Sequence, residues 1–249
     1  MKLQHNLGGI ENLGPVSVET RPFVEAWEKR IFGIHVAMMA LSQTLKDALP
    51  DYDIDAVPTA FKDDWTWGHL RTGAEGMNPF DYFKYRYFEK WLGGISSFFV
   101  AKGYVDGAAL DSRTAAYLNG QPPAKSSKPQ PEIDAQVLRY LREGDSPKRA
   151  AAAPKFAVGD RVLVKDVRPV EHTRLPGYLR GKVGEVAHVY DGAYAYFFST
   201  GPDDGIGEPM PVYCVKFEPK AIWGDTAEGG AILYADLFEA YVLPEEQAT

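Results

Sequence analysis

The sequence predicts an α+β fold, with helices in the first part of the chain and a small antiparallel β structure in the last part. In several stretches between residues 20 and 142, apolar side chains recur every three or four positions, which is the spacing of one helix face. From Phe156 onward they alternate every second position, and glycine and proline separate the runs, which is typical of short strands. We therefore expect four parts: an extended arm at 1–19, a helical domain at 20–119, a linker with a short helix at 120–154, and an antiparallel β-barrel or roll at 155–249.

The first helix is predicted to follow the N-terminal arm directly. Segment 1–19 contains glycines and a proline but no clear period, so we expect it to lie extended on another surface, such as another subunit. Thr20 and Pro22 then predict a helix start, since proline is favoured in the first helical turn. The apolar stripe of this helix consists of Phe23, Trp27, Ile31, Ile34, Met38, Leu41 and Leu45. Segment 48–77 is predicted to be irregular, because prolines and acidic turns interrupt any regular period there.

A second long helix is expected after Asn78 and Pro79, which are favoured as the N-cap and as the first helical residue. Its many aromatic side chains fall on more than one face. This distribution favours either a core helix or a helix that contacts another subunit, where aromatic residues are enriched. The pair Gly93-Gly94 predicts a bend or an interruption of this helix.

Two shorter helices, two linkers and a series of strands follow. Helices are predicted at 110–118 and 131–142, and Gly144 caps the latter. The apolar side of the latter helix is predicted to comprise Ile133, Val137, Leu138 and Leu141. Residues 120–130 and 146–154 predict linkers, because they are rich in proline, serine, lysine or alanine. Strands are predicted at 161–165, 183–190, 194–198, 212–217 and 231–238.

Composition excludes several classes of protein. The chain has 249 residues and a net charge of −7, which argues against a general nucleic-acid binder. One cysteine, Cys214, excludes an intramolecular disulfide framework and a cysteine-rich metal cluster, and its strand-like surroundings favour a small buried side chain over a nucleophile. No apolar run is long enough to span a bilayer, and no signal-peptide pattern opens the sequence, so a cytoplasmic location is expected.

The most informative stretch of the chain is a basic loop at 171–186. Pro176-Gly177 predicts a turn, and Arg174, Arg180 and Lys182 flank the entrance to a predicted strand. Arginine suits the binding of oxyanions, because its planar fork donates two parallel hydrogen bonds. Spacing alone favours the simpler interpretation of a solvated basic loop.

Particular residues of this loop resemble a known family. His172-Thr173-Arg174, followed by Pro176, Tyr178, Arg180, Gly181 and Lys182, resembles the signature loop of the nitrile hydratase β subunit. Other blocks resemble the same family in the same order: Gly8-Gly9 to Gly14-Pro15-Val16; Trp27-Glu28; Arg71, Glu75, Met77 and Pro79; Tyr87, Glu89 and Trp91; Tyr213, Val215 and Phe217; Ile222-Trp223-Gly224; and Leu237 to Tyr241. The resemblance covers nearly the whole chain.

The resemblance implies a fold, a partner and a reaction. It implies an SH3-like barrel for the C-terminal domain, and an α subunit that joins this chain, with an α₂β₂ assembly expected. In the family the α subunit carries a Cys-x-x-Cys-Ser-Cys motif that holds Co(III) or non-haem Fe(III), and two of its cysteines are oxidised. The metal acts as a Lewis acid, and a nitrile becomes an amide by addition of water. We expect no metal to be bound by this chain alone, whose five histidines show no ligand spacing.

Two arginines are the expected catalytic contribution of this chain. In the family, two β-subunit arginines hydrogen-bond the oxidised cysteines, and they match Arg71 and Arg174. Buried anionic oxygens need such donors, because burying a charge without a partner is very costly. Each charge-assisted hydrogen bond contributes roughly 1.5–3 kcal/mol. The alternative for each residue is an arginine at the surface or at the core edge.

Four other residues are expected to form the substrate pocket. Tyr87 matches a family tyrosine near the substrate cavity, and Trp91, four residues later, lies on the same helix face. Trp67 resembles a residue of the pocket or its entrance. His35 stands where relatives often have an apolar or aromatic residue, a departure that bears on substrate preference. Core packing is the alternative for the aromatic residues.

Two other functions within this family stay open from the sequence. One is a subunit of thiocyanate hydrolase, where the β-like region is divided between two chains, so the intact length here favours nitrile hydratase. The other is a non-catalytic chaperone or metal-delivery adaptor. The sequence does not distinguish cobalt from iron, nor aliphatic from aromatic nitriles, and it does not explain the segment 45–67.

Overall fold

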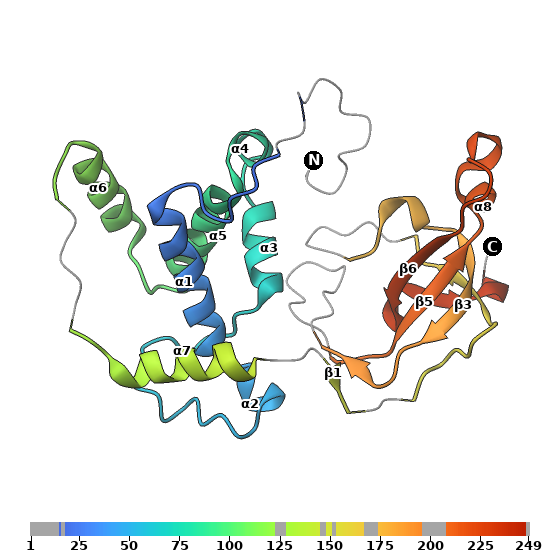
Figure 1. Cartoon of the computed structure of the whole chain (residues 1–249), viewed down its shortest axis with the longest axis horizontal. Coiled ribbons are helices and arrows are strands. Elements are labelled where there is room, and N and C mark those ends of the chain that lie inside the picture. The colour runs from blue at the N-terminus through green and yellow to red at the C-terminus, as the bar shows by residue number, and fades with distance from the viewer. Residues whose placement is uncertain are drawn as a thin grey trace. The chain divides into compact units, whose positions relative to one another are not determined.

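The computed structural model describes residues 15, 18–122, 128–144, 148–150, 153–166, 174–195 and 208–247. The chain divides into two compact units at residues 145 and 146, and each unit is described by itself (Figure 1). In the part of the chain described, the first unit contains helices, whereas the second contains the strands, one short α-helix and four 3-10 helices. The predicted α+β class is therefore confirmed. The predicted arm at 1–19 and most of the predicted linkers lie outside the described residues, so those domain limits stay a prediction.

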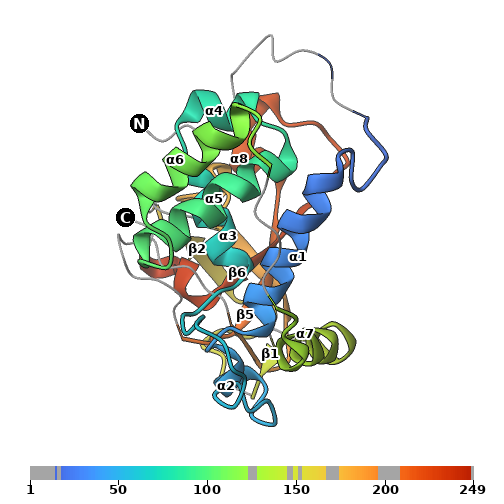
Figure 2. The ribbon, with the colours of Figure 1, turned by 90° about the vertical axis from the view of Figure 1, so that its left-hand side faces the viewer.

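The helical unit contains seven α-helices in the part of the chain described. They are α1 (Ala26–Ala40), α2 (Leu45–Ala48), α3 (Trp67–Glu75), α4 (Pro79–Lys84), α5 (Tyr87–Ala101), α6 (Gly107–Leu118) and α7 (Pro131–Glu143). Their core consists of Ile31, Met38, Leu41, Phe61, Trp65, Leu70, Phe88, Trp91 and Ile95. Helix α7 crosses the C-terminal end of α1 (Figure 2), where the Gln136 amide donates a hydrogen bond of 2.9 Å to the carbonyl oxygen of Ala40.

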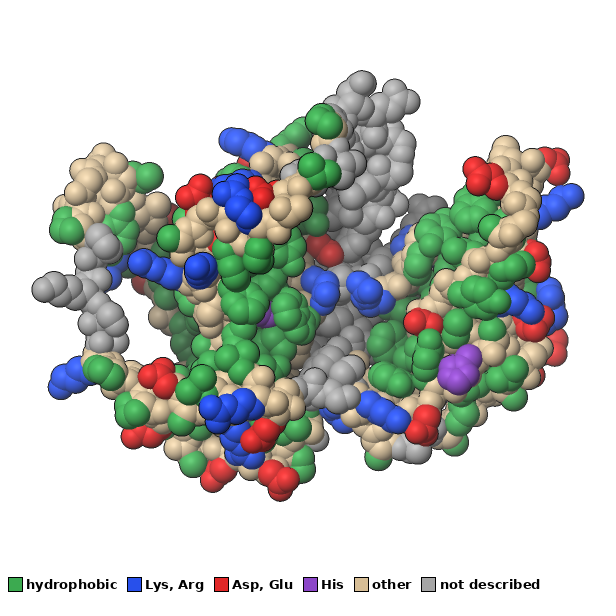
Figure 3. Space-filling view, viewed as in Figure 1, with side chains coloured by type: hydrophobic (Ala, Val, Ile, Leu, Met, Phe, Trp, Pro, Cys, Tyr) green, Lys and Arg blue, Asp and Glu red, His purple; other side chains and the backbone are tan. Residues whose placement is uncertain are grey.

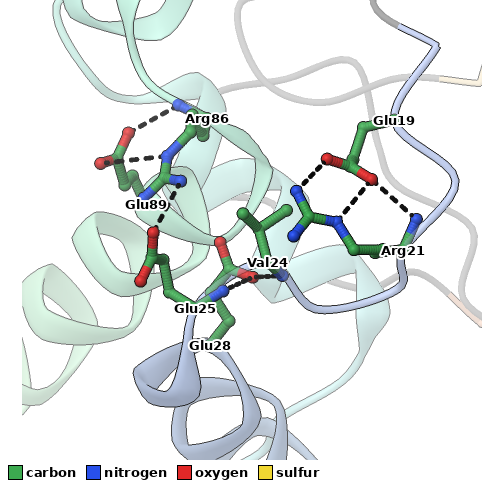
Figure 4. Close-up of polar contacts among 7 residues, drawn as sticks. All are labelled: Glu19, Arg21, Val24, Glu25, Glu28, Arg86 and Glu89. Atoms are coloured by element: carbon green, nitrogen blue, oxygen red, sulfur yellow. Dashed lines mark hydrogen bonds and ion pairs between the residues drawn. The ribbon is translucent and has the colours of Figure 1, made fainter.

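Helix α1 begins several residues later than the sequence predicts. Its first turn is closed by Glu28, whose buried carboxylate accepts hydrogen bonds from the backbone nitrogens of Val24 (2.5 Å) and Glu25 (3.1 Å) (Figure 4). Arg86, at the start of α5, lies 3.8 Å from Glu25, which ties the beginnings of the two helices together. A glutamate three residues inside the helix thus decides the boundary, rather than the proline at position 22.

The prediction that segment 48–77 is irregular is wrong near its end, where helix α3 (Trp67–Glu75) forms. The Thr66 hydroxyl accepts a hydrogen bond from the backbone nitrogen of Gly68 (3.2 Å), and the His69 ring accepts one from the backbone nitrogen of Thr66 (3.1 Å). These two contacts close the first turn in the manner of a capping box, with histidine in the place of glutamate. The signal was present in the sequence but in an unusual form.

The second long helix is also different from its prediction. It is two helices, α4 and α5, because Arg86 adopts an extended conformation and its backbone nitrogen donates to the Glu89 carboxylate (2.7 Å). Helix α5 then continues through Gly93-Gly94 without interruption. Gly94 instead allows close packing: a Cβ added there would lie 3.0 Å from the backbone nitrogen of Ala74 in α3.

The buried face of α7 is rotated from the predicted one. Leu138 and Leu141 are exposed, whereas Gln136 is buried and Tyr140 packs near the small cluster formed by Leu45, Tyr52 and Ile54. The amide of Gln136 occupies this interface because it satisfies a carbonyl at the end of α1, where the helix leaves such groups unpaired. An apolar stripe alone did not identify that contact.

The second unit is built on an antiparallel sheet. Its five strands, in the spatial order β6-β5-β3-β2-β7, are β6 (Leu233–Phe238), β5 (Val212–Phe217), β3 (Val183–Val189), β2 (Arg161–Val164) and β7 (Val242–Pro244). A separate pair joins β1 (Lys148–Arg149) to β4 (Ala193–Tyr194), and α8 (Pro219–Trp223) follows β5. Among the residues described, no pairing joins the outer strands β6 and β7, so no closed barrel is found. The SH3-like barrel stays a prediction.

The core of this sheet follows the alternation that the sequence predicts. Tyr213, Val215 and Phe217 of β5 are buried, and the residues between them are partly exposed. Cys214, one of these intervening residues, has its thiol pKa raised by burial, which does not favour a nucleophilic thiolate. In the neighbouring strand, a Cβ added at Gly184 would lie 2.8 Å from the carbonyl oxygen of Lys216, so the strands pack closely there. No described helix is long and apolar enough to cross a membrane.

Candidate functional site

A pocket of about 180 Å³ lies in the helical unit, between α3, α4 and α5. Figure 3 shows apolar side chains gathered on the visible face of this unit, around α1 and α3. Both apolar and charged side chains line the pocket: Trp67, Leu70, Arg71, Ala74 and Glu75 from α3, Tyr82 from α4, and Tyr87, Lys90 and Trp91 from α5. Such a mixture of aromatic walls and a few polar groups is typical of small-molecule sites.

The close approach of α3 and α5 positions these side chains. Gly73 and Gly94 face each other, and a Cβ added at Gly73 would lie 3.0 Å from the Gly94 Cα. With no side chain at either position, the helix backbones approach more closely than larger residues would allow. Arg71 and Ala74 on one helix and Trp91 on the other are thereby brought to the same pocket.

The aromatic wall consists of three side chains expected to line the pocket. Tyr87 is largely exposed and Trp91 is buried, and their ring centroids lie 5.3 Å apart, as their four-residue spacing predicts. The Trp67 ring lies 5.6 Å from that of Trp91 at an interplanar angle of 80°. The exposed Tyr87 hydroxyl can donate to a bound molecule, and the two indoles can pack against an apolar group.

Arg71 is exposed and lines the same pocket. Its Nη1 donates a hydrogen bond of 3.3 Å to the carbonyl oxygen of Trp67, and its guanidinium carbon lies 5.9 Å from the centroid of the Trp67 ring. The side chain therefore folds back along its own helix, with the guanidinium against the indole. This placement presents a positive charge at the pocket, where an anionic group can reach it.

His35 lies behind the aromatic wall and does not itself line the pocket. Its imidazole is fully buried in α1, with ring centroids 4.3 Å from Trp67 and 4.9 Å from Trp91. Nδ1 accepts a hydrogen bond of 3.0 Å from Nε1 of Trp65, whereas Nε2 has no partner among the described residues. Burial, helped by the nearby charge of Arg71, lowers the pKa of His35 to about 4, so the imidazole is neutral at neutral pH.

Three charged or polar residues of the pocket were not predicted as site residues: Glu75, Tyr82 and Lys90. The Lys90 ammonium lies 4.3 Å from the centroid of the Tyr82 ring, and burial lowers the pKa of Lys90. Burial, followed by the charge of Glu75, raises the pKa of Tyr82. Helical spacing could have found two of them, because Glu75 follows Arg71 by four positions and Lys90 follows Tyr87 by three.

Arg174 belongs to the other unit and is described separately. Its side chain is exposed, and its backbone nitrogen donates a hydrogen bond of 3.4 Å to the Tyr241 hydroxyl. Further along the loop, Tyr178 stacks on Trp223 with a centroid distance of 6.0 Å. His172 and Thr173 of the signature loop lie outside the described residues. Arg71, Trp67, Tyr87 and Trp91 thus share one pocket, whereas Arg174 is carried by a loop of the strand unit.

The chemistry of the pocket does not fit a metal site of this chain. Throughout the described ranges, no group of three or more histidine, cysteine, aspartate or glutamate side chains could hold a metal ion. The pocket presents an arginine, a lysine and two phenols with a single carboxylate. These groups serve mainly as hydrogen-bond donors toward an anion or a polar molecule, rather than as metal ligands.

The buried histidine predicts an acid-sensitive helical unit. In the folded chain the pKa of His35 is about 4, lower than its ordinary value of 6.5. The neutral imidazole therefore contributes fully to the unfolding free energy above pH 6.5, and this contribution is lost as the pH falls toward 4. Between pH 7 and pH 4.5 this loss is about 2–3 kcal/mol of unfolding free energy. Urea unfolding of the wild-type chain and of His35→Leu at both pH values measures it. Burial also lowers the pKa of His69, and several carboxylates are shifted, so the informative quantity is the difference between the two proteins. A difference that does not change with pH would contradict the assignment.

Family models and curated relatives match nearly the whole chain. A family model described as "Nitrile hydratase beta subunit, N-terminal" matches residues 1–139, and the model of the corresponding C-terminal region matches residues 146–244. The low-molecular weight cobalt-containing nitrile hydratase subunit beta of Rhodococcus rhodochrous is 31% identical over 245 residues, covering 96% of this chain and 98% of that protein. The cobalt-containing nitrile hydratase subunit beta of Pseudonocardia thermophila is 28% identical, covering 96% of this chain and 94% of that protein. A solved thiocyanate hydrolase apo-enzyme from Thiobacillus thioparus covers 49% of this chain and 99% of its own, with 21% identity and a TM-score of 0.34.

Proposed function

The chain belongs to the nitrile hydratase β-subunit family, and on that premise we propose that the pocket between α3 and α5 is its share of a nitrile-hydrating site formed with an α subunit. One observation carries the proposal. Four residues that the family resemblance selects from separate parts of the sequence, Trp67, Arg71, Tyr87 and Trp91, line one pocket. The enzyme is a lyase that adds water to a nitrile and releases the amide.

The metal of the enzyme is proposed to be held by the α subunit. Two relatives are named as cobalt-containing, and among the described residues of this chain no group of three or more possible ligands could hold a metal ion. When bound, the metal would supply Lewis-acid activation, either as cobalt or as non-haem iron. The contribution of this chain is then to bind the substrate and to stabilise anionic groups of the partner.

Arg71 is proposed to donate hydrogen bonds to the oxidised cysteine oxygens of the α subunit. Its guanidinium is exposed at the pocket, so a partner that covers the pocket would exclude water from it. A charge-assisted hydrogen bond in such a place contributes about 1.5–3 kcal/mol. Arg174, exposed on the loop of the strand unit, is proposed to donate hydrogen bonds to oxidised cysteine oxygens as well. The α₂β₂ assembly is part of this proposal.

The aromatic wall is proposed to bind the organic part of the nitrile. The indoles of Trp67 and Trp91 provide the apolar surface, and the Tyr87 hydroxyl provides a polar group at the exposed end. This division of roles leaves the chemical step to the partner. Two further expectations from the sequence, an SH3-like form of the strand unit and a cytoplasmic location, stay predictions.

Co-expression tests the proposed function directly. We expect the isolated chain to release no amide from a nitrile, because its described residues provide no metal site, and we expect the complex purified with its α subunit to do so. Amide formation measured by chromatography, together with the metal content of both samples, decides the outcome. A complex that consumes thiocyanate but not nitriles would support the hydrolase alternative. Loss of this chain from the purified active enzyme would support the adaptor alternative.

A further inference from the structure

His35 is a buried ionisable group that the proposed function does not use. It lies on α1, and three tryptophans surround it: Trp65, Trp67 and Trp91. Its side chain is completely inaccessible to solvent. A histidine in such a place is most often a core residue whose two nitrogens are both hydrogen-bonded. The hydrogen bonds of His35 differ from that pattern.

The contact with Trp65 fixes the tautomer of the imidazole. An indole Nε1–H can only donate, so Nδ1 of His35 accepts at 3.0 Å and its single proton lies on Nε2. Among the described residues this Nε2–H has no acceptor. A leucine at position 35 would fill similar space without this unpaired donor, but it would leave the Trp65 Nε1–H without its acceptor. Core packing therefore gives no net preference for histidine over leucine here.

The imidazole is linked to the pocket through two indoles. Trp67 and Trp91 both contact the His35 ring and both line the pocket. Trp67 is 42% exposed, so few neighbours restrain it on its outer side, where the Arg71 guanidinium lies. On the inner side of Trp67, the centroid of the His35 ring lies 4.3 Å from that of the indole. The hydrogen bond from Trp65 holds the His35 imidazole in one orientation. The orientation of the pocket wall thus depends on the orientation of the imidazole.

We propose that His35 is a positioning residue that sets the tilt of the Trp67 and Trp91 indoles, and thereby the affinity of the pocket for nitriles with an aromatic group. The inference rests on the proposed function of the pocket. An aromatic nitrile gains most from the wall, because offset or edge-to-face ring contacts depend on the relative angle of the rings. A small aliphatic nitrile touches little of the wall and depends on it less.

The test uses the α–β complex with benzonitrile and acetonitrile as probes. For His35→Leu we expect the KM for benzonitrile to rise about tenfold, as the loss of ordered ring contacts implies, with kcat changed by less than about threefold. The KM for acetonitrile should change by less than about threefold. His35→Asn should restore most of the affinity for benzonitrile, because its side-chain oxygen can accept the Trp65 N–H from about the position of Nδ1.

Stability should change little in His35→Leu. The substitution removes the unpaired Nε2–H but leaves the Trp65 Nε1–H without its acceptor, so one unpaired buried donor replaces another. Should His35→Leu not fold, His35→Gln replaces it, because the longer amide reaches the Nε2 position and leaves Trp65 without an acceptor. The comparison of His35→Asn with His35→Gln then gives the same answer. The exposed His188 of the strand unit provides a matched control, and His188→Asn should leave both KM values unchanged.

Several outcomes would overturn the inference. Equal KM increases for both nitriles would indicate general damage to the pocket, and a benzonitrile KM within about twofold of wild type would show that the imidazole does not set the wall. The near-ultraviolet circular dichroism of the isolated chain provides a measurement that does not depend on nitrile hydration. An indole signal unchanged by His35→Leu overturns the positioning role. A wild-type complex that forms no amide, with an indole signal that does change, overturns the proposed function alone.

Discussion

Arg71→Lys is expected to lower kcat/KM of the α–β enzyme for nitriles by about 10- to 100-fold, the equivalent of one charge-assisted hydrogen bond of about 1.5–3 kcal/mol. Lysine keeps the positive charge but cannot donate two parallel hydrogen bonds to a pair of oxygens. It also lacks the guanidinium, whose carbon lies 5.9 Å from the centroid of the Trp67 ring. Initial rates of amide formation at several nitrile concentrations measure the effect.

A matched control separates this loss from a general effect of lysine. Arg113→Lys changes an exposed arginine of α6, far along the chain from the pocket residues, and should leave kcat/KM unchanged. Arg174→Lys should resemble Arg71→Lys in direction and size. Wild-type turnover in both Arg71→Lys and Arg174→Lys would remove the proposed role of the two arginines, while the family membership of the chain would stand.

Gly94→Val is expected to destabilise the helical unit by about 3 kcal/mol and to abolish measurable nitrile hydration by disrupting the pocket. A Cβ at this position would lie 3.0 Å from the Gly73 carbonyl carbon and 3.0 Å from the Ala74 nitrogen. Both are backbone atoms of a helix, which cannot move aside as a flexible side chain can. The two helices must therefore separate, and both carry residues that line the pocket. Urea unfolding gives the free energy, and amide formation by the complex gives the activity.

Gly33→Val provides the control for this substitution. Gly33 also lies inside a helix, α1, but no heavy atom lies within 4 Å of a Cβ added there. The same valine should change the unfolding free energy by less than about 1 kcal/mol, because only helix propensity is affected. Equal destabilisation by the two substitutions would show that the close approach of α3 and α5 is not what Gly94 provides.

Elements whose signals are local were predicted well. Strand β5 occupies the predicted residues 212–217, because each of its side chains alternates between the core and the other face of the sheet. Helix α7 begins at Pro131 as predicted and is followed by Gly144, since a proline and a glycine act on the backbone next to them. These signals depend on a few neighbouring residues, so a sequence states them completely.

Elements whose signals depend on distant partners were predicted poorly. Gly94 reads as a helix breaker in the sequence, yet it lies within the continuous helix α5, because α3 requires a position without a side chain. The buried face of α7 includes Gln136, because its amide reaches a carbonyl nearly a hundred positions earlier in the chain. No local pattern announces such a partner, so propensity and periodicity are overridden there.

For the candidate site, the sequence by itself determined the family, the types of residue and two arginines that suit oxyanion binding. Only the tertiary structure decided that Trp67, Arg71, Tyr87 and Trp91 line a single pocket, that Lys90 joins them, and that His35 lies behind the wall rather than in it. The physical reason is that residue identity fixes what a side chain can donate or accept. The packing of α3 and of α1 against α5 fixes which side chains meet.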